Sequence, residues 1–215
     1  MLAICIGIID DIRVEKENDQ NKILKKVMYE EVRANYNVET LKDNPTVRAY
    51  RDMYWRLSID PTKTRPSGEA LLRRVLNGKD LPNISTAVDE YNMASMKTIV
   101  PLSGFDLDRL TPPFQIRFAK DNENFTGIGM AKPLSLTANM LVLADEKQIV
   151  CIYPYRDADN TKITTASHNA MIVGYGAPEI SLLQLRAAIE MALSFIKEVS
   201  GGQIGMIKTF QSLPE

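Results

Sequence analysis

The change in hydrophobic periodicity along the chain constrains its fold most strongly. From residue 18 to residue 96, apolar side chains recur mainly at spacings of three and four, as on one face of a helix. Short apolar runs between turn residues then predict strands, and one more helical pattern follows them. Helices that precede strands, instead of alternating with them, predict an α+β fold with a mixed or antiparallel sheet flanked by helices.

Local signals predict where these elements begin and end. Asn18 or Asp19, Asn44, Ser67 and Asn83 are candidate N-caps, because short polar side chains can accept hydrogen bonds from the first free amides of a helix. The expected helices are Asn18–Tyr36, a segment from Pro45 that stops before Asp60, Gly68–Asn77, Ile84–Met96 and Pro178–Val199; the expected strands are Leu2–Ile9, Phe114–Phe118, Met140–Ala144, Ile149–Tyr155 and Ala170–Val173.

Length and composition favour one compact domain over residues 1–215. The 215 residues are 45% hydrophobic and 25% charged, which suits one sizeable core. The sequence contains no apolar run of about eighteen residues, and its first residues lack a basic stretch and a cleavage site. We therefore expect a cytoplasmic protein that does not enter a membrane.

Several kinds of site are disfavoured by the absence of their motifs. The chain has no phosphate-binding loop, no dinucleotide glycine fingerprint, no nucleophile elbow and no paired cysteines. Cys5 and Cys151 lie in apolar runs and are expected to be buried free thiols, while His168, the single histidine, has no partner at metal-ligand spacing. We expect neither a metal nor a cofactor.

Charge is balanced overall but not locally. The net charge is -1, whereas residues 45–80 contain eight basic and four acidic side chains, a local balance of +4. This segment could contact a phosphate backbone through Arg65, Arg73 and Arg74. A solvated helical face explains the same residues equally well.

The first polar cluster lies in residues 81–110. Ser103-Gly104-Phe105-Asp106 could form a turn whose glycine lets main-chain donors approach a small ligand. Asp106 and Asp108 could instead only cap a turn before Leu110. The polar residues of the cluster are Asn83, Asp89, Asn92, Ser103, Asp106 and Asp108.

The second polar cluster directly follows the expected strand Ile149–Tyr155, where side chains can line a pocket. Arg156 could bind a phosphate or carboxylate, and Thr164 and Thr165 could offer hydroxyls to a ribose, a water or an ammonium. An exposed hairpin turn is the alternative.

The order of these residues resembles one family. Leu81-Pro82-Asn83, Val88-Asp89, Asn92, Pro101-Leu102 and Phe105-Asp106 follow the pattern of the B3/B4 module of the phenylalanyl-tRNA synthetase β subunit. The upstream Arg65-Pro66-Ser67 and the downstream Arg156-Asp157, with Thr161-Lys162 and Thr164, resemble free-standing members of that family, so that the resemblance covers about Val47–Val173.

The resemblance implies a tRNA-editing or aminoacyl-tRNA-binding protein, because the synthetase module hydrolyses the ester of mischarged tyrosyl-tRNA. Ser103 stands where the family has a histidine, and Asp157 is the nearest acidic candidate for the glutamate that reads the tyrosine hydroxyl. A site that recognises its substrate through hydrogen bonds is expected to select a different substrate when the hydrogen-bonding residues are replaced. We therefore expect a different aminoacyl group.

The expected mechanism is ester hydrolysis by a positioned water, without a protein nucleophile. Asn83, Asn92, Ser103 and the Gly104 amide are the candidates to orient the water and stabilise the oxyanion. The expected substrate-binding residues are Asp89, Phe105, Asp106, Arg156, Asp157, Thr164 and Thr165. The alternative function is a non-catalytic module that binds tRNA, another RNA or an amino acid.

Overall fold

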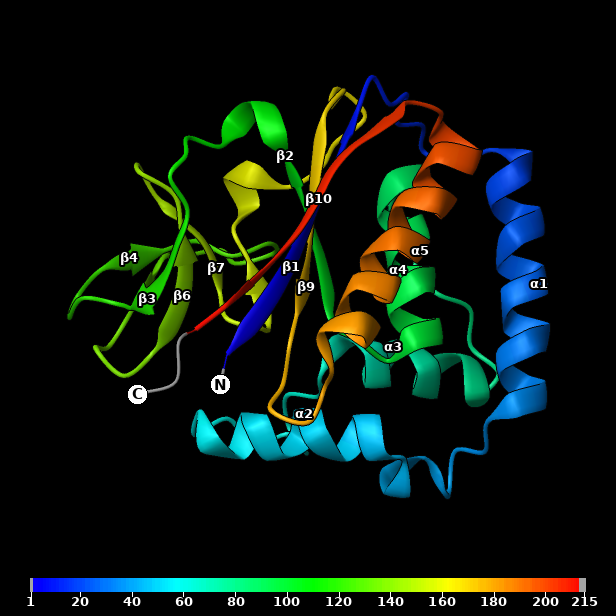
Figure 1. The fold of residues 1–215 in the computed structure, drawn as a ribbon, viewed down its shortest axis with the longest axis horizontal. Helices are drawn as coiled ribbons and strands as arrows, with labels where there is room; N and C mark the ends of the chain where they lie inside the picture. Colours follow the sequence, from blue (N-terminus) through cyan, green and yellow to red (C-terminus); the bar gives the residue numbers. More distant parts are fainter. Residues whose placement is uncertain (1, 213–215) are drawn as a thin grey trace.

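A central antiparallel sheet organises the protein. The structure, a computed structural model, describes residues 2–212. Its central sheet has the strand order β10-β1-β9-β2, and each neighbouring pair is antiparallel (Figure 1). The strands are β1 (Ala3–Asp10), β2 (Leu102–Asp106), β9 (Ala170–Tyr175) and β10 (Gln203–Gln211).

Helices cover one face of this sheet. Figure 1 shows α4 (Thr86–Thr98) and α5 (Leu182–Ser200) beside the central sheet, with α1 (Asp19–Asn35) outside them. Gly7 of β1 permits close packing, because a Cβ there would lie 2.5 Å from Ile189 and 2.7 Å from Leu193 of α5. The remaining helices are α2 (Pro45–Arg56), α3 (Ser67–Leu76) and the short 3-10 helices η1 (Leu41–Asp43), η2 (Leu107–Arg109) and η3 (Asp159–Thr161).

A second sheet lies on the opposite side of the central sheet (Figure 1). Its strand order is β3-β6-β7-β8, again antiparallel, and a two-stranded β4-β5 ribbon accompanies it. The strands are β3 (Gln115–Phe118), β4 (Asn124–Phe125), β5 (Leu134–Ser135), β6 (Leu141–Ala144), β7 (Ile149–Ile152) and β8 (Arg156–Asp157). The expected α+β class with antiparallel sheets is confirmed.

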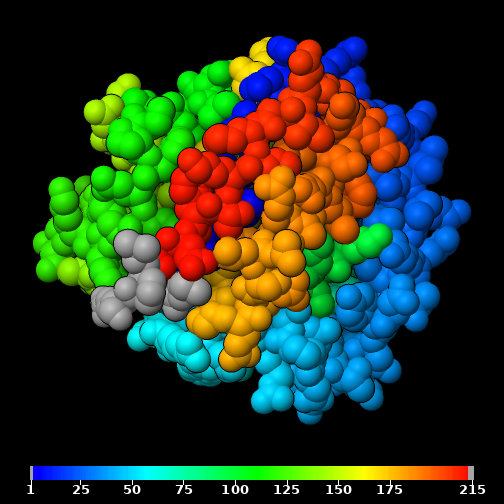
Figure 2. All heavy atoms as spheres, viewed as in Figure 1, coloured from blue at the N-terminus to red at the C-terminus, as the bar shows by residue number. Residues whose placement is uncertain are grey.

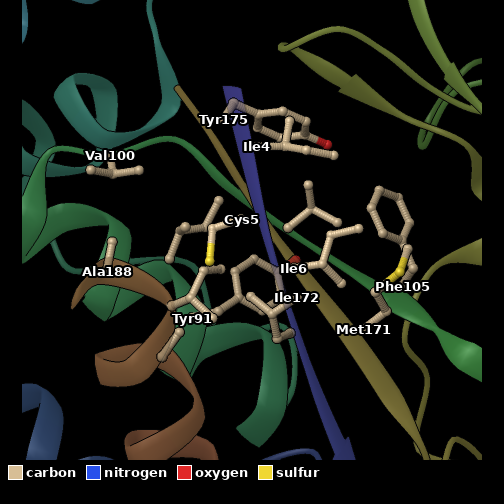
Figure 3. Close-up of a cluster of buried hydrophobic side chains, with 14 of the residues drawn as sticks. Ile4, Cys5, Ile6, Tyr91, Val100, Phe105, Met171, Ile172, Tyr175 and Ala188 are labelled. Carbon is tan, nitrogen blue, oxygen red and sulfur yellow. The ribbon is translucent and has the colours of Figure 1, made fainter. Parts of the chain in front are cut away.

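The main core therefore extends over both faces of the central sheet. In Figure 3, Tyr91 and Ala188 lie on one side of β1, and Phe105 and Met171 lie on the other. These side chains belong to one continuous buried cluster that also includes Val150 of β7. Figure 2 shows β10, in red, crossing the surface between the second sheet and α5.

Several element predictions are confirmed. Asn18 and Asn44 accept hydrogen bonds at the starts of α1 and α2, as their positions predicted. Gly78 follows α3 with a φ of 75°, and Cys5 and Cys151 are buried free thiols. No helix within residues 2–212 has the length and apolar character needed to span a bilayer.

Other element predictions are wrong. Ser103–Asp106 is not a turn but strand β2, because its backbone pairs with Met171 and its neighbours on β9. Strand β10 was not predicted, and β7 ends at Ile152, three residues early. The caps also differ: Ser67 is the first residue of α3, and Ser85 precedes α4 in place of Asn83.

Candidate functional site

The two polar clusters of the sequence contact each other directly where β2 faces β8. Ser103 Oγ donates a hydrogen bond to Asp157 Oδ1 at 2.8 Å, across 54 residues of chain. β2 is an edge strand of the central sheet, and β8 is an edge strand of the second sheet. The contact therefore joins the two sheets through a hydroxyl and a carboxylate.

Antiparallel pairing positions both side chains. Ser103 opposes Val173 of β9, and Asp157 opposes Cys151 of β7, so each polar residue sits on a strand whose neighbour belongs to the core. Ser103 is only 5% exposed, whereas Asp157 keeps part of its surface in contact with solvent. Asp157 is therefore the more exposed residue of the pair.

Three tyrosines and a thiol surround the pair. Tyr175 Oη lies 3.2 Å from Cys151 Sγ, and burial together with the nearby Cys151 and Asp157 raises the pKa of Tyr175. Burial also raises the pKa of Tyr54 and of Tyr91, and the charge of Asp157 raises both further. We call these residues the Asp157 cluster: Tyr54, Tyr91, Ser103, Cys151, Asp157 and Tyr175.

The carboxylate of this cluster has an unusual environment. Burial raises the pKa of Asp157 to about 6, although the hydrogen bond from Ser103 and the charge of Arg156 lower it. No ion pair to Asp157 forms within the described residues 2–212. At neutral pH the group is therefore a largely ionised, poorly solvated carboxylate without a bonded cation.

Gly104 lets the ring of Tyr91 pack next to Ser103. A Cβ on Gly104 would lie 2.5 Å from Cε1 of Tyr91, so only glycine lets the ring pack directly on β2. The backbone amide of Gly104 lowers the pKa of Tyr91, while the larger effect of burial raises it. The glycine thus shapes the site through the space that it leaves.

Asn83 and Asp89 have their hydrogen-bond partners elsewhere. Lys25 Nζ on α1 donates to Asn83 Oδ1 at 2.5 Å and to Asp89 Oδ2 at 2.7 Å. Asp89 Oδ1 also accepts from the Ile84 amide at 3.0 Å. These contacts fasten α1 to the start of α4, so the structure does not bring either side chain into the Asp157 cluster.

Asp106 and Thr164 form a third group. Ser167 Oγ donates to Asp106 Oδ2 at 2.7 Å and lies 3.5 Å from Thr164 Oγ1. Asp106 Oδ1 accepts from the Asp108 amide at 3.2 Å, which agrees with the alternative that it caps a turn. Thr165 is exposed beside this group.

The other predicted contact residues are distributed around the cluster. Phe105 is completely buried, and Asn92 is half-buried on α4 directly after Tyr91. Arg156 is exposed; its side chain packs against Gly127, and its Nη1 donates to the Ile128 carbonyl at 3.4 Å. Arg156 is therefore available to solvent at the outer side of β8.

The predicted RNA-binding arginines line one hollow of about 560 Å³ on α3. The guanidinium of Arg73 already makes hydrogen bonds within the protein: its Nε donates to Glu69 Oε1 at 2.6 Å and its Nη1 donates to the Val38 carbonyl at 3.2 Å. Arg74 donates to the Asp80 carbonyl. The hollow is lined by Arg65, Ala70, Arg73, Arg74, Asn77 and Lys79, without an acidic residue.

Comparison with known proteins decides the family. The B3/4 domain model matches residues 49–201, which is most of the chain. The chain belongs to the B3/4 domain family.

The similar curated proteins are phenylalanine–tRNA ligase β subunits. The subunit of Francisella tularensis is 24% identical over an alignment of 161 residues that covers 64% of this chain and 20% of the relative. That of Fusobacterium nucleatum is 27% identical over an alignment of 169 residues that covers 68% of this chain and 21% of the relative. The chain thus spans about a fifth of the length of these relatives.

The fold agrees with a solved structure of the same kind. An N-terminal fragment of the phenylalanyl-tRNA synthetase β subunit from Pyrococcus horikoshii superimposes with a TM-score of 0.51 and 13% identity. The similarity covers 98% of this chain and 51% of that fragment. It includes β1 and β10, which lie outside the matched domain range but pair with each other in the central sheet.

Within this B3/4 fold, the tyrosines of the cluster are the residues that sequence reasoning did not identify as part of a site. The three tyrosines were not among the predicted site residues, and Cys151 was expected only to be a buried free thiol. Their polar atoms were the available signal, because buried hydroxyls need partners. No group of three His, Cys, Asp or Glu suited to a metal occurs in residues 2–212.

Proposed function

We propose that this B3/4 protein hydrolyses the ester of a mischarged aminoacyl-tRNA and binds the aminoacyl group at the Asp157 cluster. The observation that carries the proposal is the 2.8 Å hydrogen bond from Ser103 to Asp157. It joins the two polar segments that resemble the editing module of phenylalanyl-tRNA synthetase. The protein would then act on aminoacyl-tRNA in the cytoplasm.

The reaction needs a positioned water and no protein nucleophile. The water adds to the ester carbonyl carbon, the bond to the ribose oxygen breaks, and the departing oxygen takes up the proton. Asn92 is the proposed donor to the developing oxyanion, since its half-buried amide makes no side-chain hydrogen bond within residues 2–212 and it follows Tyr91 on α4. Asp157 and the hydroxyls hold the aminoacyl group, so that orientation supplies much of the rate.

A panel of aminoacyl-tRNAs tests this function. We expect release of the amino acid from at least one member, with a loss of about 100-fold or more in Asp157→Asn if the cluster holds the substrate. Asp19→Asn, at the exposed start of α1, is the matched control and should retain full activity. Deacylation no faster than in buffer for every member of the panel would contradict the proposal.

A second candidate function, a non-catalytic RNA-binding module, is favoured by the basic hollow on α3. Arg65 and Arg74 are the residues to change, because Arg73 also holds the buried Glu69. We expect Arg65→Glu with Arg74→Glu to weaken tRNA binding and reduce its dependence on salt. A flat titration that salt does not affect would exclude this function.

A further inference from the structure

We propose that the Asp157 cluster is a receptor for a primary ammonium group, the α-ammonium of the aminoacyl substrate. The inference rests on the proposed function and specifies which part of the substrate the cluster recognises. It predicts that the protein selects aminoacyl groups with a free amine over those with a blocked amine.

The first argument is the unpaired charge of the cluster. Asp157 carries a carboxylate at the junction of the two sheets, and Ser103 is its one side-chain hydrogen-bond partner within residues 2–212. Arg156, the adjacent cation, is exposed and donates to the Ile128 carbonyl, so it does not neutralise Asp157 by direct contact. A poorly solvated carboxylate is stabilised most by a cation that binds it directly.

The second argument is an unused hydroxyl. Tyr54 is completely buried, and its Oη has no hydrogen-bond partner within residues 2–212. Tyr54 lies one helical turn after Tyr50 on α2, and Tyr50 Oη donates to the Tyr175 carbonyl at 2.7 Å, which places this face of α2 against the strand that carries Tyr175. A buried hydroxyl without a partner calls for an explanation, and a ligand that donates to it would supply one.

An ammonium matches both features. It has three N–H donors and no acceptor, so one ammonium can donate to a carboxylate such as Asp157 and to a hydroxyl oxygen such as that of Tyr54. Aromatic rings also attract cations, and the ring of Tyr91 packs on Gly104, next to Ser103. No charged side chain within residues 2–212 forms an ion pair with Asp157, so none competes with the ammonium for the carboxylate.

Other ligands fit less well. A phosphate or carboxylate would be repelled by Asp157, and a neutral hydroxyl would leave its charge unpaired. A divalent metal ion normally takes several carboxylate or imidazole ligands, whereas the cluster offers one carboxylate. The ammonium therefore explains the charge and the free hydroxyl with one ligand.

The experiment compares two non-hydrolysable compounds, a 3′-aminoacylamido adenosine with a free α-amine and the same compound N-acetylated. The aminoacyl group is taken from the best member of the tRNA panel, or from alanine if no member is hydrolysed. Calorimetry should show binding about 10-fold or more tighter for the free amine in the wild-type protein. Asp157→Asn should remove this preference, and Tyr54→Phe should reduce it, whereas Tyr36→Phe outside the cluster should leave it unchanged.

The outcomes separate this inference from the proposed function. Equal affinity for both compounds, absence of binding, or a preference that persists in Asp157→Asn would overturn the ammonium receptor. Selective binding without ester hydrolysis would support the receptor and contradict the hydrolase. Hydrolysis of free and N-acetylated aminoacyl-tRNA at the same rate would support the hydrolase and contradict the receptor. The wild-type comparison decides the question even if a variant does not fold.

Discussion

The side-chain Nδ2 of Asn21 donates a hydrogen bond to Oε1 of Glu90 at 2.7 Å, while Asn21 Oδ1 and Glu90 Oε2 are buried without a partner. Asn21 lies on α1 and Glu90 on α4, and both are almost completely buried. A protonated Glu90 would satisfy both oxygens, because its O–H can donate to Asn21 Oδ1. We infer that Glu90 is held as a neutral acid in the folded protein.

Glu90→Gln should therefore stabilise the protein, and more so at high pH. Burial raises the pKa of Glu90 from 4.5 to about 8; the charges of Asp89 and Glu198 also raise it, while the Asn21 hydrogen bond and Lys25 oppose the shift. Because the folded pKa is above the unfolded one, this contribution to stability is complete below pH 4.5 and is lost as the pH rises to about 8. The variant should gain little at pH 4.5 and up to about 5 kcal/mol above pH 8.

Urea unfolding between pH 4.5 and 9 measures this difference. Glu179→Gln, an exposed change before α5, is the control and should alter stability by less than about 0.5 kcal/mol. A difference between Glu90→Gln and wild type that does not change with pH would refute the neutral acid.

Glu69→Gln should destabilise the protein by about 3 kcal/mol. Arg51 Nη2 and Arg73 Nε lie 2.5 Å and 2.6 Å from Glu69 Oε1, and the carboxylate is completely buried. Burial by itself raises the pKa of Glu69, but the bonds from both arginines lower it overall, so the contribution to stability is present above pH 4.5 and is lost as the pH falls. Chemical unfolding at pH 7 should show the loss.

The exposed pair Arg186–Glu190 provides the comparison for Glu69. Its Nε–Oε1 distance is 2.8 Å, but both side chains are about half exposed, so Glu190→Gln should change stability by less than about 1 kcal/mol. Equal effects of the two substitutions would show that burial does not strengthen the Glu69 interactions.

Gly104→Ala should destabilise the protein by about 1 to 3 kcal/mol, because the new methyl group would overlap the ring of Tyr91. Gly205→Ala on β10 is the matched control: the nearest atom to its added Cβ is 3.4 Å away, an ordinary contact. Thermal unfolding of both variants checks the prediction. A Gly104→Ala variant as stable as Gly205→Ala would mean that Tyr91 moves aside freely.

Ser103→Ala should shift the acidic limb of the activity profile to higher pH. The hydrogen bond from Ser103 lowers the pKa of Asp157, which is about 6 because burial raises it, so removing the bond raises that pKa further. If ionised Asp157 holds the substrate, activity declines as the pH falls through this value. The midpoint should rise by roughly one pH unit in Ser103→Ala. It should not change in Ser135→Ala, an exposed control. An unchanged midpoint in both variants would show that the activity does not depend on the ionisation of Asp157.

The helices and the caps of α1 and α2 could be predicted from the sequence because they depend on neighbouring residues. Asn18 and Asn44 accept from amides two or three residues ahead, and the glycines at 201 and 202 follow α5. Strand β2 could not be predicted in this way, because Ser103 and Gly104 acquire strand geometry through pairing with β9, about seventy residues later. Asn83 was misassigned for the same reason, since its partner Lys25 lies on α1.

The sequence by itself determined the α+β class, most helix boundaries and the order of residues that resembles the B3/4 family, because local spacing carries this information. Only the tertiary structure decided which polar residues share a site. It brought Ser103 to Asp157, fastened Asn83 and Asp89 to Lys25, and added Tyr54 to the cluster. The physical reason is that strand pairing and the packing of two sheets, not proximity in the chain, set the distances between these groups.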